Sequence, residues 1–294
     1  MSLFRGAGVA LVTPFTEEKD VDYKELGRLI EYQIKGGSDA IIVCGTTGEP
    51  VTMTEEERLS VISYTVEKTA GRVPVIAGSG GNCTENVVSF SKKAQLFGAD
   101  GLLVVTPYYN KATQNGLYEH YKAVAMAVDI PIVLYNVPSR TGVNILPDTA
   151  ARLGKEIEHI VALKEASGNM TQVAEVIQKA EGTLDIYSGN DDQIVPILSL
   201  GGIGVISVLA NIVPDVTHNM VMEFLNGNVE DAARLQLQYL ELIQAIFCEV
   251  NPIPVKKALE LLGFSTKTLR MPLTEMEDKN VIRLKLAMHQ VGLL

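Results

Sequence analysis

The chain contains no tryptophan, three cysteines and four histidines, and these small numbers argue against several kinds of site. The cysteines, Cys44, Cys83 and Cys248, are too few and too widely spaced for a disulfide framework or a zinc ribbon. No histidine lies four residues from another, which is the helical spacing of a metal-binding pair. We therefore expect no metal site built from histidine and cysteine, and a protein of the reducing cytoplasm.

Positive charge is also scarce, because 25 lysine and arginine residues stand against 35 aspartate and glutamate residues, for a net charge of −10. An acidic surface repels nucleic-acid phosphates and anionic lipids, so we expect neither nucleic acid nor a membrane as a partner. No hydrophobic run approaches the roughly 20 residues of a membrane span. The start, MSLFRGAGVALVTPFTEEKD, lacks a small-residue cleavage pattern, so we expect no leader peptide.

What the sequence does contain is an alternation of short β-branched runs with longer amphipathic stretches. The runs are continuously hydrophobic, which is typical of parallel strands covered on both faces. They lie at residues 9–12, 40–43, 73–77, 101–105, 130–134, 160–163, 184–187 and 204–209. About eight strand–helix units fit before residue 226, and eight units close a (β/α)8 TIM barrel. A doubly wound open sheet is the alternative, but a G-x-G-x-x-G motif after the first strand and a P-loop are both missing.

The strand signal stops after Asn226. We predict a catalytic barrel over residues 1–226 and a small C-terminal helical extension over residues 227–294. The extension is expected to hold about three helices, with breaks near Asn251-Pro252 and before Pro272. Thr54, followed by three glutamates, predicts the start of a helix within the barrel.

Polar segments follow several of the predicted strands. They are GTTGE at 45–49, TPYYN at 106–110, YNVPSRTG at 135–142 and SGND at 188–191. The active site of a TIM barrel lies where the strands end, so these segments are expected to share one rim. Hydroxyls, phenols, an arginine and a lysine meet there.

Lys164 is the strongest single signal, because it closes an apolar strand. Burial favours the neutral amine, which is a nucleophile toward carbonyls. The structural alternatives are an ion pair with Glu165 or a side chain that extends to the rim. Successive strand residues point to opposite faces, which places Glu165 badly for pairing with an inward Lys164.

The other polar residues each have a structural interpretation as well. Tyr135, at a strand end, can serve packing alone, and Arg140 can be a solvated surface charge. Thr46 and Thr47 can serve only to bond the local backbone in a turn, and Tyr108 and Tyr109 can belong to a subunit interface. Asp191 and Asp192 can mark the start of a helix. Their common location favours a functional site.

These residues resemble the dihydrodipicolinate synthase family, within the N-acetylneuraminate lyase superfamily, from about Phe4 to the C-terminus. GTTGE is typical of the superfamily, whereas YNVPSRTG with its arginine points to the synthase branch. LKEASGN at 163–169 is a further specific part of the resemblance, and GVISVLAN at 204–211 adds support. The resemblance implies a lyase that condenses pyruvate with L-aspartate 4-semialdehyde through a lysine Schiff base. The product would be 4-hydroxy-tetrahydrodipicolinate, in the first committed step of diaminopimelate and lysine biosynthesis.

The resemblance also implies roles for individual residues. The amine of Lys164 would attack the keto carbon of pyruvate, and the phenol of Tyr135 would act as acid and base. Thr46 would relay protons between Tyr135 and Tyr109, a tyrosine that reaches in from a neighbouring subunit. The implied partner is therefore a second copy of the chain, in a homotetramer built from two tight dimers. No metal and no other cofactor is implied, because the protonated imine is the electron sink.

Four further residues are implied to bind the substrates. Thr47 would hold the carboxylate of pyruvate, and Arg140 the carboxylate of the semialdehyde. Gly189 and Ile206 would line the site with their backbone carbonyls. A single guanidinium can capture an anion even on an acidic protein.

The family's lysine-binding regulatory site is only partly matched. Asn82 and Tyr108 agree with it, but Glu55 and Arg58 stand at histidine positions, and Asn86 replaces a glutamate. Loss of that glutamate removes the carboxylate that would pair with the ammonium group of lysine. We therefore expect weak or absent inhibition by lysine.

Two other functions remain open at this point. A different Schiff-base pyruvate aldolase, such as N-acetylneuraminate lyase or a 2-keto-3-deoxy sugar acid aldolase, would keep Lys164 but would need a polyol site in place of Arg140. A non-catalytic barrel that only binds a ligand would show no turnover and no covalent adduct.

Overall fold

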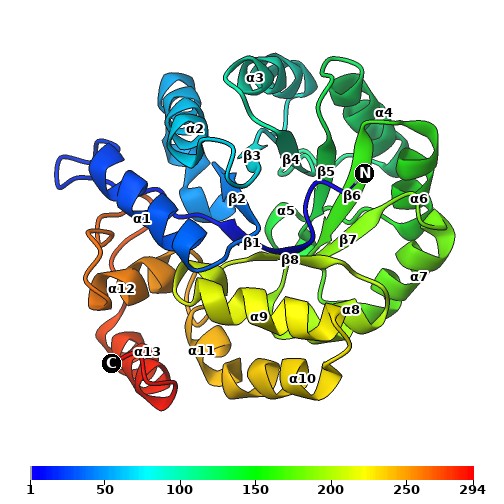
Figure 1. Ribbon diagram of the computed structural model, residues 1–294. Helices are drawn as coiled ribbons and strands as arrows, with labels where there is room; N and C mark the ends of the chain where they lie inside the picture. The colour runs from blue at the N-terminus through cyan, green and yellow to red at the C-terminus, as the bar shows by residue number, and fades with distance from the viewer. Residues whose placement is uncertain (1) are drawn as a thin grey trace.

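Eight parallel strands close into a barrel in the computed structural model, which describes residues 2–294 (Figure 1). The strands are β1 (Gly6–Ala10), β2 (Ala40–Val43), β3 (Val75–Gly78), β4 (Gly101–Val105), β5 (Ile132–Asn136), β6 (Ile160–Glu165), β7 (Asp185–Ser188) and β8 (Gly204–Ser207). They pair in sequence order, and β1 pairs with β8 to close the ring. The predicted TIM barrel is confirmed.

Helices surround the barrel and fill the connections between its strands (Figure 1). They are α1 (Tyr23–Lys35), α2 (Glu55–Thr69), α3 (Thr84–Leu96), α4 (Gln114–Ala125), α5 (Pro138–Thr141), α6 (Pro147–Glu156), α7 (Met170–Ala180), α8 (Ile194–Ser199) and α9 (Pro214–Leu225). The chain continues into α10 (Val229–Gln238), α11 (Leu240–Ala245), α12 (Ile253–Leu261) and α13 (Asp278–Gln290). These last helices lie together on one side of the barrel in Figure 1.

Local sequence signals explain where the helices begin and end. The Thr54 hydroxyl accepts from the Glu57 N–H, and the Glu57 carboxylate accepts from the Thr54 N–H, which forms a capping box at the start of α2. Asp22 caps α1 in a similar way, accepting from the Glu25 N–H. After α3, Gly98 has a φ of 90°, which a residue with a side chain rarely adopts.

Strand side chains alternate between the barrel interior and the helices. The interior cluster includes Phe4, Ala10, Ala40, Ile42, Ile76, Leu103, Val133, Ala162 and Ile206. Tyr135 belongs to the same cluster, and Lys164 shares the inward face of β6 because it lies two residues after Ala162. The alternation therefore directs both proposed reactive groups toward the barrel axis.

Two boundaries differ from the sequence prediction. The first strand is β1, Gly6–Ala10, and not residues 9–12. Its glycines allow the strands to approach closely, since a Cβ on Gly204 would lie 2.1 Å from the Gly6 carbonyl oxygen. The extension contains four helices within the described residues, where about three were expected. Hydrophobic periodicity runs across the break at Tyr239, which separates α10 from α11.

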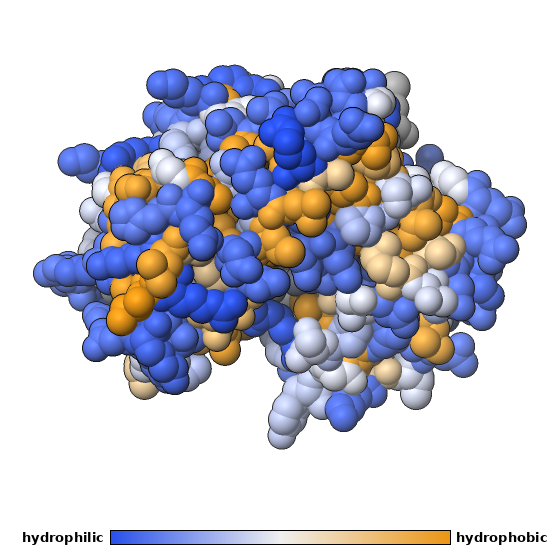
Figure 2. All heavy atoms as spheres, turned by 90° about the horizontal axis from the view of Figure 1, so that it is seen from below, coloured by the Kyte–Doolittle hydropathy of each residue, from blue (hydrophilic) through white to orange (hydrophobic). Residues whose placement is uncertain are grey.

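The surface on the side of the C-terminal helices is mixed in character. Figure 2 shows hydrophobic residues scattered among hydrophilic ones on this face. Exposed large hydrophobic side chains of the C-terminal helices include Leu237 on α10 and Ile282 and Leu286 on α13. Among the described helices, we find none with the length and hydrophobicity needed to cross a membrane.

Candidate active site

A cavity of about 180 Å³ lies at the carboxyl ends of the strands. Its lining includes Thr46, Thr47, Tyr135, Arg140, Lys164, Gly189, Asn190, Phe247 and Asn251. A neighbouring cavity of about 250 Å³ shares Thr46, Tyr135 and Arg140 with it and extends to Tyr108 and Val51. The structure thus brings most of the residues singled out in the sequence to one place.

Lys164 and Tyr135 face each other across the β5–β6 ladder, where they are paired in register. The Lys164 Nζ lies 4.4 Å from the centre of the Tyr135 ring. Burial lowers the pKa of Lys164 to about 8, an effect that the Asp191 carboxylate opposes and the Arg140 guanidinium reinforces. Burial also raises the pKa of the Tyr135 phenol, opposed by Arg140 and the Thr46 hydroxyl. The amine is therefore easily deprotonated, while the phenol keeps its proton at neutral pH.

Glu165 points away from Lys164, so the ion pair considered as an alternative is wrong. Its buried carboxylate accepts from the Ser167 N–H at 2.7 Å, from Asn136 Nδ2 at 3.0 Å and from Gln172 Nε2 at 3.1 Å. Asn136 is the register partner of Glu165, next to Tyr135. This network fixes the ends of β5 and β6 and with them the two inward side chains.

Asp191 has a role that the sequence did not reveal. Asp191 begins the 3₁₀ turn η3 (Asp191–Gln193), which agrees with the helix start considered from the sequence. Its carboxylate, however, is buried. The carboxylate accepts from the Ser207 hydroxyl at 2.5 Å and from the N–H groups of Val208 and Leu209 at 3.1 and 2.9 Å. It therefore holds the loop after β8 and places a negative charge near Lys164.

The two threonines lie in the 3₁₀ turn η1 (Thr46–Gly48), directly after β2. The residues flanking this loop, Cys44 and Glu49, have φ values of 54° and 55°, in the left-handed region. The loop also approaches β3 closely, because a Cβ on Gly78 would lie 2.1 Å from the Cys44 carbonyl oxygen. Strained backbone and tight packing hold the two hydroxyls in place.

Arg140 lies on the short helix α5 and lines both cavities. Its Nη2 donates to the backbone carbonyl of Asn251 at 3.3 Å. Gly189 also lies in the site, where a Cβ would come within 3.1 Å of Lys164 Cε. Ile206, by contrast, is buried in the barrel interior and is not among the lining residues of the Lys164 cavity.

Tyr109 does not reach the cavity of its own chain. It is 91% exposed and has a φ of 73°. Tyr108 lines the neighbouring cavity, and the Asn82 carbonyl accepts from Asn110 Nδ2 at 2.9 Å. Asn86 is exposed on α3.

Arg58 and Glu55, which stand at the histidine positions of the family's regulatory site, are engaged within the chain. The Arg58 guanidinium lies 3.7 Å from the centre of the Phe90 ring and donates to the Gly78 carbonyl at 2.9 Å. Glu55 forms an ion pair with Lys93.

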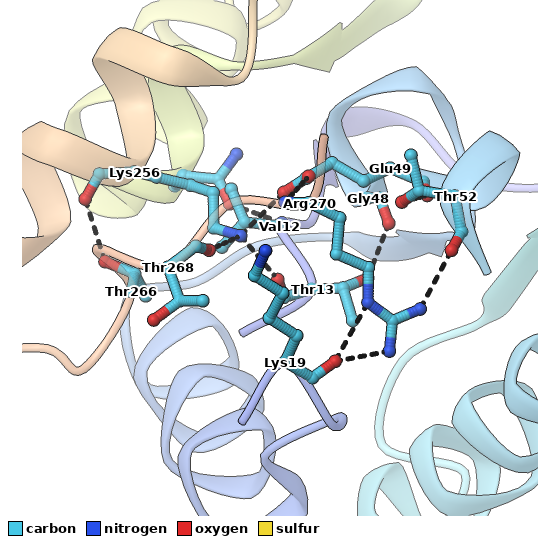
Figure 3. A network of polar contacts seen from close by, with 11 residues as sticks. Val12, Thr13, Lys19, Gly48, Glu49, Thr52, Lys256, Thr266, Thr268 and Arg270 are labelled. Atoms are coloured by element: carbon cyan, nitrogen blue, oxygen red, sulfur yellow. Dashed lines mark hydrogen bonds and ion pairs between the residues drawn. The ribbon is translucent and has the colours of Figure 1, made fainter. Parts of the chain in front are cut away.

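The C-terminal extension contributes directly to this end of the barrel (Figure 3). The buried Lys256 Nζ lies 2.6 Å from Glu49 Oε1 and also donates to the carbonyls of Thr13 and Thr268. Asn251 Nδ2 donates to Thr47 Oγ1 at 2.9 Å. The sequence suggested only a helix break at Asn251, since its contact with Thr47 spans 204 residues and leaves no local pattern.

Within residues 2–294 we find no group of three or more histidine, cysteine, aspartate or glutamate side chains placed to hold a metal ion. The cysteines are free, and Cys44 is buried beside Arg58. Burial raises the pKa of the Cys44 thiol to about 12, so this sulfur stays protonated at neutral pH.

A TIM barrel that holds a buried lysine and a phenol at the carboxyl ends of its strands has the architecture of class I aldolases, which react through a lysine amine. The particular family follows from comparison with known proteins. The model of the dihydrodipicolinate synthetase family matches residues 3–291, and the chain belongs to this family.

Individual relatives agree over their full length. The 4-hydroxy-tetrahydrodipicolinate synthase of Lachnoclostridium phytofermentans is 58% identical over 294 residues, with 100% of each chain covered. The crystal structure of dihydrodipicolinate synthase from Thermotoga maritima matches with a TM-score of 0.98 and 43% identity, covering 100% of both chains. A structure of the Cyanidioschyzon merolae enzyme with lysine bound matches with a TM-score of 0.97 and 41% identity, again over 100% of both chains.

Proposed function

We propose that the chain condenses pyruvate with L-aspartate 4-semialdehyde, acting as a 4-hydroxy-tetrahydrodipicolinate synthase. The observation that carries this proposal is the buried Lys164 amine, with a pKa lowered to about 8, beside the Tyr135 phenol. The full-length similarity to synthases supports the choice of substrates. Arg140 at the cavity favours a second substrate with a carboxylate over a polyol.

The reaction begins when the neutral amine of Lys164 adds to the keto carbon of pyruvate and water leaves, which gives a protonated imine. Loss of a proton from the methyl group converts the imine to an enamine. The enamine carbon attacks the aldehyde carbon of the semialdehyde, so that a carbon–carbon bond forms and the protonated imine returns. The aldehyde C=O π bond opens, and its oxygen takes up a proton and becomes a hydroxyl. The amine of the semialdehyde then attacks the imine carbon, so that the ring closes and Lys164 is released as a free amine. The imine itself takes up the electrons, and we assign no cofactor to the reaction.

Tyr135 is proposed as the acid and base of these steps, with Thr46 relaying protons to Tyr109 of a neighbouring subunit. The raised pKa of the buried Tyr135 phenol suits the delivery of a proton to the leaving water. Tyr109 is almost fully exposed, as a side chain that completes another subunit's site would be before assembly. We propose a homotetramer of two tight dimers, in which the dimer contact brings this phenol to the site.

Thr47 is proposed to bind the carboxylate of pyruvate, and Arg140 that of the semialdehyde. Both line the cavity that contains Lys164. Gly189 is proposed to present its carbonyl there, and its lack of a side chain leaves room for Lys164. Ile206 is proposed to contribute its carbonyl from the end of β8. Asn82 and Tyr108 are proposed as remnants of a lysine-binding site.

The division into a catalytic barrel, residues 1–226, and a helical extension, residues 227–294, also remains a proposal. Contacts of Asn251 and Lys256 with the loop after β2 support an extension that completes the site and has no separate function. We propose that the reaction takes place in the cytoplasm, which cell fractionation tests. Activity is expected to survive dialysis against a metal chelator.

The direct test is reduction with borohydride in the presence of pyruvate, followed by intact mass measurement and peptide mapping. We expect one pyruvate adduct on the peptide containing Lys164 and none in Lys164→Ala. An unmodified, folded wild-type protein would contradict the mechanism. A panel of aldehyde substrates then tests the partner: turnover with a sugar aldehyde but not with aspartate semialdehyde would assign the chain to another pyruvate aldolase.

A further inference from the structure

Asn251 connects two residues of the proposed site from outside the barrel. It lies between α11 and α12, and the residue is buried, with 5% of its surface exposed. Its side-chain Nδ2 donates to Thr47 Oγ1 at 2.9 Å. Its backbone carbonyl accepts from Arg140 Nη2 at 3.3 Å. One residue of the extension thus contacts both of the groups proposed to bind substrate carboxylates.

The contact with Thr47 determines what this hydroxyl can offer to a ligand. A hydroxyl has one proton to donate and lone pairs to accept with. Because Thr47 Oγ1 accepts from the amide of Asn251, its own proton remains free to be donated. Thr47 lines the cavity that contains Lys164, and a donor there suits the carboxylate of a bound keto acid.

The contact between the Asn251 carbonyl and Arg140 fixes the orientation of the guanidinium group. Arg140 is exposed, and a free arginine side chain loses conformational entropy when it binds an anion. A hydrogen bond from one nitrogen to the Asn251 carbonyl restricts the guanidinium and leaves its other donors for a ligand.

The stability of the fold does not by itself explain why residue 251 carries a side-chain amide. The Asn251 Oδ1 is buried and has no hydrogen-bond partner within residues 2–294. A buried acceptor without a partner costs stability that an apolar side chain would not.

We propose that Asn251 is a positioning residue that prepares both carboxylate-binding groups, its side chain acting on Thr47 and its backbone carbonyl on Arg140. This inference rests on the proposed function, since it assigns pyruvate to Thr47 and the semialdehyde to Arg140. The two contacts are separable, because substitution of the side chain leaves the carbonyl in place.

The test compares Asn251→Ala and the isosteric Asn251→Asp with the wild-type enzyme. In Asn251→Ala we expect the KM for pyruvate to rise about fivefold to tenfold, the effect of losing one hydrogen bond. The KM for the semialdehyde is expected to stay within about twofold, because the carbonyl still holds Arg140. Asn251→Asp should raise the pyruvate KM further, since its carboxylate accepts the Thr47 proton and repels the substrate.

Two controls separate positioning from a general structural effect. Asn280→Ala removes another asparagine hydrogen bond of the extension, to Glu249, and should leave both KM values unchanged. In a Thr47→Val background, Asn251→Ala should raise the pyruvate KM no further, because the Asn251 side chain acts on pyruvate only through the Thr47 hydroxyl, which is already absent. Equal increases in the two KM values, or additive effects with Thr47→Val, would overturn the proposal.

Borohydride trapping distinguishes failure of this inference from failure of the proposed function. The pyruvate concentration for half-maximal trapping is measured without the semialdehyde, and we expect it to rise in both Asn251 variants. If the folded variants reach half-maximal trapping at the same pyruvate concentration as the wild type, the role of Asn251 alone is overturned. Absence of any adduct in the wild type would overturn both.

Discussion

Among single residues, Lys164 shows most directly how the fold changes chemistry. An exposed lysine with a pKa of 10.5 has only ~0.03% of its amine neutral at pH 7. Burial, opposed by Asp191 and reinforced by Arg140, lowers the pKa of Lys164 to about 8. The neutral fraction at pH 7 then becomes roughly 10%, a gain of about 300-fold in available nucleophile.

The rate of imine formation is therefore expected to rise about tenfold per pH unit below pH 8 and to level off above it. Quenching with borohydride at timed intervals and measuring intact mass gives this rate. Asp191→Asn removes the charge that favours protonation and should move the midpoint to lower pH. A rate that still increases steeply above pH 10 would mean that the amine is solvated.

A second prediction at this scale concerns regulation by lysine. The positive charge of Arg58 lies over Phe90, close to Tyr108, and repels the ammonium groups of a lysine effector. Asn86 supplies no carboxylate to offset it. We expect lysine to inhibit the enzyme weakly or not at all at concentrations well above those of the cell, measured as an inhibition curve. Half-inhibition at micromolar lysine would contradict this.

Residues that are recognisable from the sequence share a local signal. Lys164 ends an apolar run, and the inward direction of its side chain follows from strand alternation. Asn251 and the buried carboxylate of Asp191 have no such signal, because their partners lie in other segments, 204 residues away for Asn251 and 16 for Asp191. Neither periodicity nor local motif encodes a contact across 204 residues.

At the scale of elements, the extension is attached to the barrel by a buried ion pair between Lys256 on α12 and Glu49 in the loop after β2 (Figure 3). Arg270 adds to the attachment by donating to the Thr52 carbonyl and to Glu57 at the start of α2. Removing one member of such a pair leaves an uncompensated buried charge.

Lys256→Met is therefore expected to lower the free energy of unfolding by about 3–5 kcal/mol. Thermal or denaturant unfolding measures this loss. The double variant with Glu49→Gln should lose less than Lys256→Met alone, since no buried charge remains. Equal stability of Lys256→Met and the wild type would mean that Glu49 is neutral or solvated.

Element boundaries show where sequence patterns reach their limit. Strands such as β2 and β4 coincide with their apolar runs because both faces of each are covered. The predicted first strand, residues 9–12, lies too far along the chain, since β1 spans Gly6–Ala10. The first residues of β1 that pair with β8 are small and carry little hydrophobic signal. The break between α10 and α11 was missed for the opposite reason, since apolar residues continue across it.

For the whole molecule, the central prediction is that an active site needs two copies of the chain. Tyr109→Phe and Lys164→Ala should each be nearly inactive alone. After the two variants are mixed, dissociated and reassociated, a mixed dimer contains one site with Lys164 from one subunit and Tyr109 from the other. Activity should then recover to roughly a quarter of the wild-type value, because half of the dimers are mixed and half of their sites are complete.

Sedimentation of the mixture confirms that dimers have reformed. Recovery is expected to depend on reassociation, so that covalently cross-linked homodimers of each variant remain inactive when mixed. Full activity of Tyr109→Phe alone would contradict a role for this phenol across the interface.

The contact between Thr47 and Asn251 also has a consequence for synthesis of the chain. The threonine leaves the ribosome 204 residues before the asparagine, a delay of roughly 10–40 s at ordinary rates of translation. During this time Glu49 lacks its ion-pair partner Lys256, and β1 lacks its neighbouring strand β8. A chain cut short before Asn251 carries Lys164 but lacks a finished anion site. Unfinished or proteolysed copies are therefore poorly equipped to capture pyruvate.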